Sequence, residues 1–297
     1  MIITIYPPIS IYELGNRPNQ EDALFPPPET ASEQDFVFVL CDGMGGHTDG
    51  DKASRVVADA LGHPDDKATN FSIEDFDQKL NEAYDRLDAV DNGEARKMGT
   101  TFCYVRFNNE GCLVAHMGDS RVYHIRPSER KILYKSKDHS LVQSLYDIGE
   151  ITKEEMRMHP QKNIVTRVMQ PNLGVRHNPE IRQLTDLRKG DIIYLCSDGM
   201  LEQMEDEELV RIFSVTAGND KRLTRVLRKV TEGNRDNHSA WIIRIRAVER
   251  QENVPEIMPI LSEPVAREVC MQQKEHLLRW VMFLMAFLVS LLVYLLF

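Results

Sequence analysis

The sequence is poor in cysteine and has no surplus of basic residues. Its 297 residues include five cysteines, which form no CxxC pair, and their odd number and irregular spacing exclude a disulfide framework or a cysteine-based zinc site. Lysine and arginine total 36 against 46 aspartates and glutamates, a formal net charge of −10. Because phosphate backbones are bound by clustered cations, this balance argues against a nucleic-acid-binding protein. We expect a globular chain in a reducing compartment.

Long apolar runs are absent except near the C-terminus. From Trp280 to Phe297 there are 18 residues without a charged side chain. At ~1.5 Å per residue, that helix nearly spans a ~30 Å hydrocarbon core. A buried or partner-binding helix is the alternative, but such helices usually keep a polar stripe. We therefore expect one transmembrane helix over residues 277–297, a C-terminal membrane anchor.

Charge around this run sets the expected orientation. Basic residues precede the run and none follows it, so the positive-inside rule places the catalytic part in the cytoplasm. The N-terminal segment has no basic residue ahead of its apolar run and is not expected to be a secretory signal. Residues 249–273, with three prolines and mixed charge, are expected to form a flexible linker after a domain of residues 1–248.

Short β-type runs and helical patterns fill residues 1–248. We expect strands at 36–41, 101–107, 112–117, 120–125, 191–196 and 240–246. We expect helices at 52–61, 73–90, 140–146, 153–158, 206–215 and 221–231. The joins in RFNNEGCLVA and AHMGDSRVY are so short that they predict antiparallel pairs. The pattern therefore favours a mixed α+β domain with antiparallel sheets.

Acidic residues recur where apolar strands begin or end. In antiparallel sheets the end of one strand is level with the start of its neighbour, so such residues can meet at one edge. Each Asp-Gly alone could be only a hairpin turn. Clustered carboxylates repel one another, so the combination predicts a cation, and oxygen ligands favour Mg²⁺ or Mn²⁺. The acidic residues at strand ends are Asp42, Asp119, Asp198 and Asp236, and Glu21 and Asp22 of the N-terminal segment bring the count to six.

Nine ordered segments carry a family resemblance. They are GNRPNQEDA (15–23), VLCDGMGGH (39–47), GDKAS (50–54), MGTT (98–101), HMGDSRVY (116–123), SKDHS (136–140), NIVTRVM (163–169), GDIIYLCSDGM (190–200) and DNHSAWIIRI (236–245). With these motifs the chain resembles the metal-dependent Ser/Thr protein phosphatases of the PPM type, also called protein phosphatase 2C. The DGMGGH variant is similar to the bacterial branch.

The resemblance implies a fold and a metal site. The fold would be a four-layer αββα sandwich, two antiparallel sheets flanked by helices, with residues 135–169 as a flap that governs substrate choice. Two Mn²⁺ or Mg²⁺ ions would bind at one end of the sandwich, with a third ion in some bacterial members. The implied ligands are Asp42 bridging two ions, Gly43 (through its carbonyl) and Asp236 on one ion, Asp22 and Asp198 on the other, and Asp119 with Asp198 on the third.

The same resemblance implies the remaining roles. Glu21 would act on the metals through water, and Arg17 would bind the substrate phosphate with its planar guanidinium. Animal relatives carry a His directly after the bridging Asp-Gly, but Met44 stands there in this chain. His47 is a candidate proton donor; a loop-stabilising hydrogen bond or a water as donor are the alternatives. Other histidines lack ligand spacing and are expected in core or surface roles: His63, His116, His124, His159 and His177.

The expected function is that of a membrane-tethered protein serine/threonine phosphatase. A water that bridges the two metals would attack phosphoserine or phosphothreonine directly. Phosphoproteins would be the substrates and a Ser/Thr kinase a candidate partner. The alternatives are a pseudophosphatase that docks partners at the membrane, which predicts broken ligand positions, and a metal-dependent hydrolase of small phosphoesters or nucleic acid.

Overall fold

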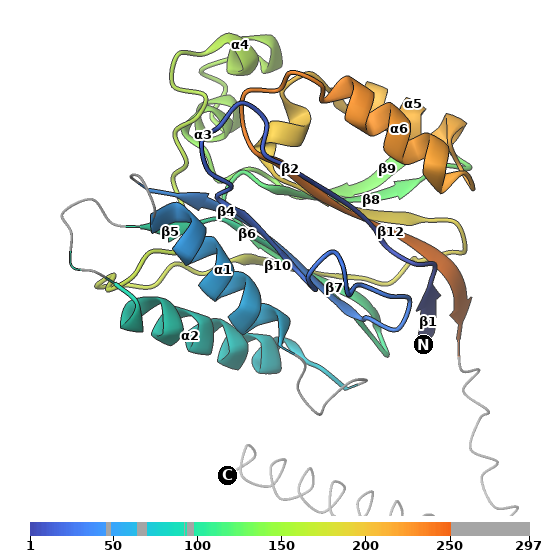
Figure 1. The fold of residues 1–297 in the computed structure, drawn as a ribbon, viewed down its shortest axis with the longest axis horizontal. Helices are drawn as coiled ribbons and strands as arrows, with labels where there is room; N and C mark the ends of the chain where they lie inside the picture. The colour runs from blue at the N-terminus through green and yellow to red at the C-terminus, as the bar shows by residue number, and fades with distance from the viewer. Residues whose placement is uncertain (46–48, 64–69, 92, 94–97, 251–297) are drawn as a thin grey trace, which may run out of the picture. The chain divides into compact units, whose positions relative to one another are not determined.

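Two antiparallel sheets stack face to face in the computed structural model, which describes residues 1–45, 49–63, 70–91, 93 and 98–250 (Figure 1). The strand order of the first sheet is β1 (Ile2–Ile5), β12 (His238–Glu249), β11 (Ile192–Cys196), β8 (Arg121–Arg126) and β9 (Lys131–Lys135), with β2 (Ile9–Glu13) also paired to β12. The order of the second is β10 (Glu180–Leu184), β7 (Gly111–Met117), β6 (Phe102–Asn108), β4 (Val37–Met44) and β3 (Asp22–Phe25), with β5 (Gly99–Thr100) paired to β4.

The central strands are apolar on both faces because each sheet is covered on both sides. In β4, Phe38 and Leu40 pack between the sheets, whereas Val39 and Cys41 pack toward the helices outside. Successive strand side chains point to opposite faces, so a strand buried on both sides becomes a nearly continuous apolar run. β11 and β12 follow the same rule, and Trp241 of β12 lies between the sheets against Phe38.

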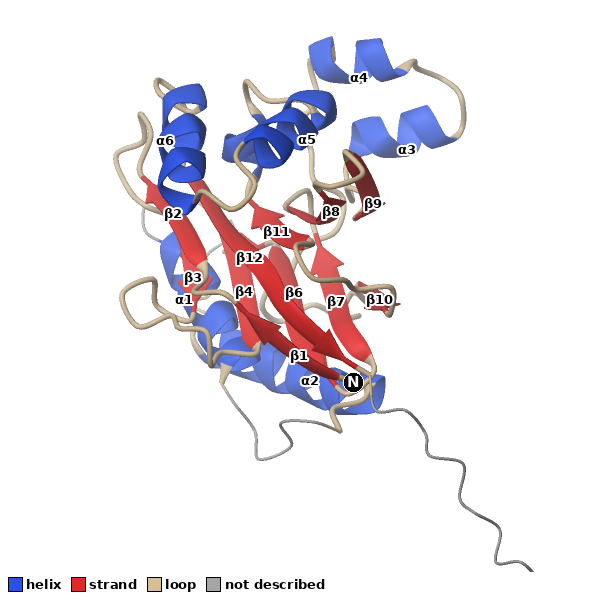
Figure 2. Ribbon diagram, turned by 90° about the vertical axis from the view of Figure 1, so that its right-hand side faces the viewer, coloured by secondary structure: helices blue, strands red, loops and turns tan. Residues whose placement is uncertain are grey.

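Helices cover the two outer faces. Helices α1 (Asp49–Gly62) and α2 (Ile73–Ala89) pack on the second sheet, and α5 (Asp206–Val215) and α6 (Asp220–Val230) pack on the first (Figures 1 and 2). α2 begins at a capping box in which Ser72 and Asp75 satisfy each other's backbone N–H groups. The predicted sandwich of two antiparallel sheets flanked by helices is confirmed.

The segment predicted as the flap leaves the first sheet after β9. It contains α3 (Leu141–Asp147) and α4 (Lys153–Met158), and it returns to the second sheet where Met169 bridges Thr100. α4 buries none of its residues, and α3 buries only Val142. The two helices therefore lie on the surface at one end of the sandwich (Figure 2).

One predicted strand pairing is wrong. The join in AHMGDSRVY does not make an antiparallel pair, because β7 pairs with β6 and β10 while β8 pairs with β9 and β11. The turn carries the chain from one sheet to the other, and Gly118 there has φ +108°, a conformation that side chains disfavour. The crossing matters because the turn carries Asp119 into the space between the sheet ends.

The remaining differences lie at edges and ends. Sequence patterns missed β1, β2, β3, β9 and β10, which are short and only partly buried. β12 runs to Glu249, the first residue of the predicted linker. Across the described residues, no helix combines the length and apolar character needed to cross a membrane. The predicted transmembrane helix 277–297 and linker residues 251–273 lie outside the described residues.

Candidate metal centre

Asp22 and Asp42 face each other across two antiparallel strands. Asp22 begins β3, Asp42 lies near the end of β4, and the two residues are register partners. The start of β3, a strand that the sequence pattern did not predict, is therefore level with the end of β4. The backbone of Asp42 is fixed from β6's side, because its N–H donates to Thr101 Oγ1 at 3.1 Å and its carbonyl accepts from Thr101 N at 2.9 Å.

Asp198 is joined to Asp22 through its neighbour Ser197. Asp198 opens a short 3₁₀ helix, η1 (Asp198–Leu201), directly after β11. The Ser197 hydroxyl donates to Asp22 Oδ2 at 3.0 Å. The other carboxylate oxygen, Oδ1, is buried and has no hydrogen-bond partner within the described part of the chain. A buried polar atom without a partner is costly, so this oxygen is a candidate ligand atom.

Asp119 reaches the same region from the turn between β7 and β8. Its neighbour Ser120 shares a 2.7 Å hydrogen bond with Thr101, the residue that fixes the backbone of Asp42. Both hydroxyls are buried. The turn that crosses between the sheets therefore places Asp119 beside the end of β4.

Asp236 lies just before β12 and is paired with Arg17. Arg17 Nη2 lies 2.7 Å from Asp236 Oδ2, and Asp236 Oδ1 accepts the N–H of Asn237 at 2.8 Å. The Arg17 side chain is 47% exposed, so it can also meet a ligand that arrives from solvent. The predicted phosphate-binding residue and the predicted ligand thus stand in direct contact.

Asn237 is a site residue that sequence reasoning missed. Its Nδ2 donates to the carbonyls of Leu14 and Asn19, at 2.7 and 3.0 Å, and its Oδ1 accepts the Glu21 N–H at 2.8 Å. One buried carboxamide therefore fastens the loop that carries Arg17 to the start of β12. The signal was the Asp236-Asn237 pair, but an Asn in a turn usually satisfies only its own loop.

Electrostatics show that the carboxylates interact. Burial, and then the charges of Asp22, Asp198, Asp119 and Asp236 in that order, raise the pKa of Asp42 well above its ordinary value. Burial is also the leading cause that raises the pKa of Asp22 and Asp119 to about 7 and that of Asp198 to about 6. Such mutual repulsion inside a protein is relieved by a bound cation.

The backbone around Gly43 also fits a metal site. A Cβ on Gly43 would lie 2.1 Å from the Gly50 carbonyl oxygen and 2.6 Å from that of Glu21, so only glycine fits. The Gly43 N–H donates to Glu21 O at 3.0 Å. A Cβ on Gly50, in the first turn of α1, would lie 2.7 Å from Glu21 Oε1, so the Glu21 carboxylate lies near the positive end of that helix.

These aspartates do not form a single tight cage. Within the described residues, the group whose ligand atoms all lie within 4.8 Å of one another is a different one, His116, His139 and Glu180. Asp22 accepts a hydrogen bond from Ser197 and Asp236 pairs with Arg17, so different partners orient these two carboxylates. The structure brings the predicted residues together, while their assignment to individual ions stays a prediction.

A model of the family described as "Protein phosphatase 2C" matches residues 15–241, which include every predicted ligand. The chain belongs to the protein phosphatase 2C family. The resemblance drawn from nine segments is therefore confirmed, and the candidate ligands of this protein phosphatase 2C chain lie at one end of its sandwich.

Two bacterial phosphatases illustrate the similarity in sequence. Serine/threonine protein phosphatase PstP of Mycobacterium tuberculosis is 32% identical over 194 residues, which cover 62% of this chain and 37% of PstP. The matched region thus spans little more than a third of that relative. Serine/threonine phosphatase stp of Listeria monocytogenes is 30% identical over 216 residues, 70% of this chain and 83% of that protein.

Solved structures agree with the family assignment. A crystal structure of the M. tuberculosis phosphatase PstP/Ppp superposes with a TM-score of 0.69 at 26% identity, covering 82% of this chain and all of that one (100%). The catalytic domain of PstP in complex with 2 manganese ions superposes with a TM-score of 0.66 at 25% identity, with the same coverage.

The proton donor remains a prediction in this protein phosphatase 2C chain. Met44 ends β4, so the position that holds His in animal members carries no titratable group here. His47 lies outside the described residues. Of the histidines expected in core or surface roles, His124 is buried and bonded to Asp191 at 2.8 Å, as expected. His116 is also buried, in agreement with a core role, and its ring stacks on that of His139.

Proposed function

We propose that this chain is a metal-dependent protein serine/threonine phosphatase that removes phosphate from phosphoserine and phosphothreonine in proteins. The observation that carries the proposal is the gathering of four aspartates at one end of the sandwich, where burial and mutual repulsion raise their pKa values. Asp22 is buried, and Asp42, Asp119 and Asp198 are half-buried. Natural proteins keep such repulsive clusters where a cation binds. The match to the family over residues 15–241 supports the reaction class.

The donor set fits Mn²⁺ or Mg²⁺. All candidate ligand atoms are oxygens. Asp42 would hold two ions, the Gly43 carbonyl and Asp236 would hold one of them, Asp22 and Asp198 would hold the other, and Asp119 with Asp198 would hold a third. When bound, two such ions supply an activated water and neutralise charge that develops on the phosphate. The two manganese ions named for the PstP structure support a count of two ions.

The chain's own residues bind and orient the substrate. Arg17 is half exposed at the edge of the carboxylate cluster, and its planar fork suits a phosphate dianion. Asn237 holds the Arg17 loop against β12, so the guanidinium is positioned before substrate arrives. Asp236 faces Arg17 and balances its charge in the absence of substrate.

A cysteine nucleophile does not fit the described residues. Cys41, Cys103, Cys112 and Cys196 are all buried. Burial raises the pKa of each thiol, that of Cys196 to about 12, whereas a nucleophilic cysteine needs a lowered pKa. Direct attack by water, without a phosphoenzyme, is the mechanism that these residues support.

Phosphate release from a phosphothreonine peptide tests the proposal. Residues 1–250 form one compact unit, so a protein of this length is suitable, with and without Mn²⁺. Asp42→Ala and Asp198→Ala should abolish turnover, while Asp220→Ala, on an outer helix, should retain it. A nucleotide assayed in parallel separates a protein phosphatase from a hydrolase of small phosphoesters, which would prefer the nucleotide.

A pseudophosphatase that docks partners is the second candidate. It predicts lost ligand positions, whereas aspartate is present at each predicted carboxylate position and glycine at position 43. A folded protein that binds Mn²⁺ but releases no phosphate from any phosphopeptide would favour docking over catalysis.

We also propose that the C-terminal segment tethers the phosphatase domain to the cytoplasmic face of a membrane, near a membrane-associated phosphoprotein or a Ser/Thr kinase. The support is the uncharged run from Trp280 to Phe297 and the basic residues before it. Removal of residues 274–297 should release the protein from membranes and leave peptide turnover unchanged. A truncated protein that stays in the membrane fraction would contradict the tether.

A further inference from the structure

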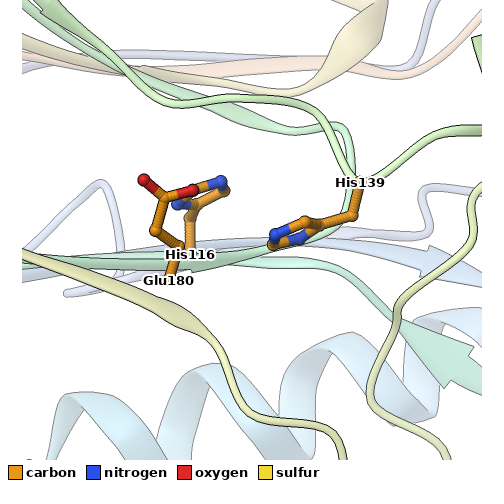
Figure 3. A group of neighbouring side chains, drawn as sticks. All are labelled: His116, His139 and Glu180. Carbon is orange, nitrogen blue, oxygen red and sulfur yellow. The ribbon is translucent and has the colours of Figure 1, made fainter. Parts of the chain in front are cut away.

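A second cluster of potential metal ligands lies outside the carboxylate centre. His116 on β7 and Glu180 on β10 are register partners on neighbouring strands, so their side chains share one face of the sheet. His139, at the root of the flap, stacks on His116 with ring centroids 4.9 Å apart (Figure 3). One ligand atom from each residue lies within 4.8 Å of the others.

His116 is oriented as metal-bound histidines usually are. Its Nε2 lies 2.9 Å from the Lys137 carbonyl oxygen, an acceptor, so Nε2 carries the proton and Nδ1 carries the lone pair. Nδ1 is buried and has no hydrogen-bond partner within the described part of the chain, and the residue is 0% exposed. In metal-bound histidines, a hydrogen bond from one ring N–H to a backbone carbonyl fixes the tautomer, so that the other nitrogen offers its lone pair to the metal.

The other two residues supply a second nitrogen and an oxygen. Burial, and then the charges of His116 and Arg167, lower the pKa of His139 to about 4, and burial lowers that of His116. Both imidazoles are therefore neutral near pH 7, the form that binds metals. The Glu180 carboxylate is half-buried and makes no hydrogen bond or ion pair with any described residue.

We propose that His116, His139 and Glu180 form a zinc site, separate from the all-oxygen carboxylate centre. Two imidazole nitrogens and one carboxylate suit Zn²⁺, whereas Mg²⁺ and Mn²⁺ prefer oxygen. Three protein ligands leave a fourth position for water. His139 and Glu180 are half-buried, so the ion enters from the surface at the flap root.

Zinc binding requires His139 to change its hydrogen bond. The rings of His116 and His139 are parallel within 1°, so their lone pairs lie in parallel planes and one ring must turn to share an ion. At present His139 Nδ1 accepts the Gly118 N–H at 3.1 Å. A neutral imidazole has one lone pair, so a metal on either nitrogen of His139 breaks this bond. Gly118 precedes Asp119, which links the zinc site to the carboxylate centre.

The Arg167 side chain lies where it would compete with a metal ion for His139. Its Nη1 lies 3.3 Å from His139 Nε2, where its positive charge opposes a cation. Its other contact at this end is a 3.3 Å hydrogen bond to the Asn178 carbonyl, so the long side chain can turn away. Replacement of this arginine should therefore tighten zinc binding.

Isothermal calorimetry tests the site by measuring the affinity of the 297-residue chain for Zn²⁺ in the presence of excess Mn²⁺. His116→Gln and Glu180→Gln should each lower the affinity for one equivalent of Zn²⁺ by more than about tenfold, because loss of a direct ligand costs more than loss of an outer partner. Two control variants should bind this equivalent of Zn²⁺ with unchanged affinity. They are His177→Gln, at a nearby exposed histidine outside the cluster, and Asp42→Ala, in the carboxylate centre. Arg167→Gln should bind it more tightly.

Cobalt gives a readout of the coordination itself. Co²⁺ in a four-coordinate site with nitrogen ligands absorbs visible light far more strongly than in a six-coordinate oxygen site, so the wild type should show bands that His116→Gln lacks. Melting curves establish that each variant is folded. Zinc binding that is unchanged in folded His116→Gln and Glu180→Gln, or that disappears in Asp42→Ala, would overturn the proposal.

Discussion

Arg17 and Asp236 form an ion pair of 2.7 Å at the edge of the carboxylate centre. The arginine that would bind phosphate is thereby held on a predicted metal ligand. The two residues lie 219 positions apart in sequence, and the pair joins the N-terminal loop to the start of β12.

Replacement of Arg17 should weaken substrate binding without unfolding the protein. Arg17→Ala removes charge-assisted hydrogen bonds worth about 1.5–3 kcal/mol, so kcat/KM for a phosphopeptide should fall roughly 10- to 100-fold. Arg17→Lys should recover little of the lost kcat/KM, because an ammonium group lacks the planar geometry of the guanidinium. Steady-state kinetics in saturating Mn²⁺ measure this, and an unchanged KM in Arg17→Ala would argue against phosphate contact.

Neutralisation of Asp22 should stabilise the protein in the absence of metal. Burial and its neighbours raise the pKa of Asp22 from 3.8 to about 7, so between these values the folded state binds more protons than the unfolded state. Stability is then fully present below about pH 4 and is lost as the pH rises to about 7. Asp22→Asn in EDTA should melt above wild type at pH 7.5 and close to it at pH 4.

The metal dependence of the same variant supplies its control. Mn²⁺ should raise the melting temperature of the wild type and have a smaller effect on Asp22→Asn, because a ligand is missing. A variant that melts below wild type in EDTA at pH 7.5 would mean that Asp22 is not under charge repulsion.

Removal of the Asn237 carboxamide should displace the Arg17 loop. Asn237→Ala loses three hydrogen bonds, at about 1 kcal/mol each, and should both lower stability and raise the KM for phosphopeptide. Asn219→Ala, which removes the N-cap of α6, is a matched control that should lower stability by about 1 kcal/mol and leave KM unchanged. Equal KM values in the two variants would assign Asn237 a purely structural role.

Asp191 should be essential for stability and remote from catalysis. It is 1% exposed and accepts hydrogen bonds from His124 at 2.8 Å and from Arg126 at 2.8 and 2.9 Å. Burial alone would raise its pKa, but these bonds outweigh burial and lower it, so its stabilising charge is lost only as the pH falls below its ordinary range. Asp191→Ala leaves buried Arg126 without this partner and should lower stability by about 3–5 kcal/mol, as measured by urea unfolding. Asp186 is an exposed partner of Arg126, so Asp186→Ala should lower stability far less than Asp191→Ala.

The sequence by itself determined the central strands, the helices and the family. Residues 37–41 and Ile192–Cys196 are buried, so their apolar runs are unambiguous, and α2 carries its own capping box. The short edge strands were missed because they are partly exposed, and their identity depends on the neighbour to which they pair. Asp42, Asp119 and Asp198 could be recognised as site residues because each comes at the end of a predicted apolar strand.

Only the tertiary structure decided which side chains meet. The turn at Gly118 and Asp119 reads as a hairpin, but each flanking strand finds its partners in a different sheet, because the packing of two sheets outweighs the local preference of a short join. The contacts of Asn237, and the stack of His116 on His139, join segments with no common sequence pattern. Local chemistry is encoded in neighbouring residues, whereas such convergence depends on sheet packing and strand register.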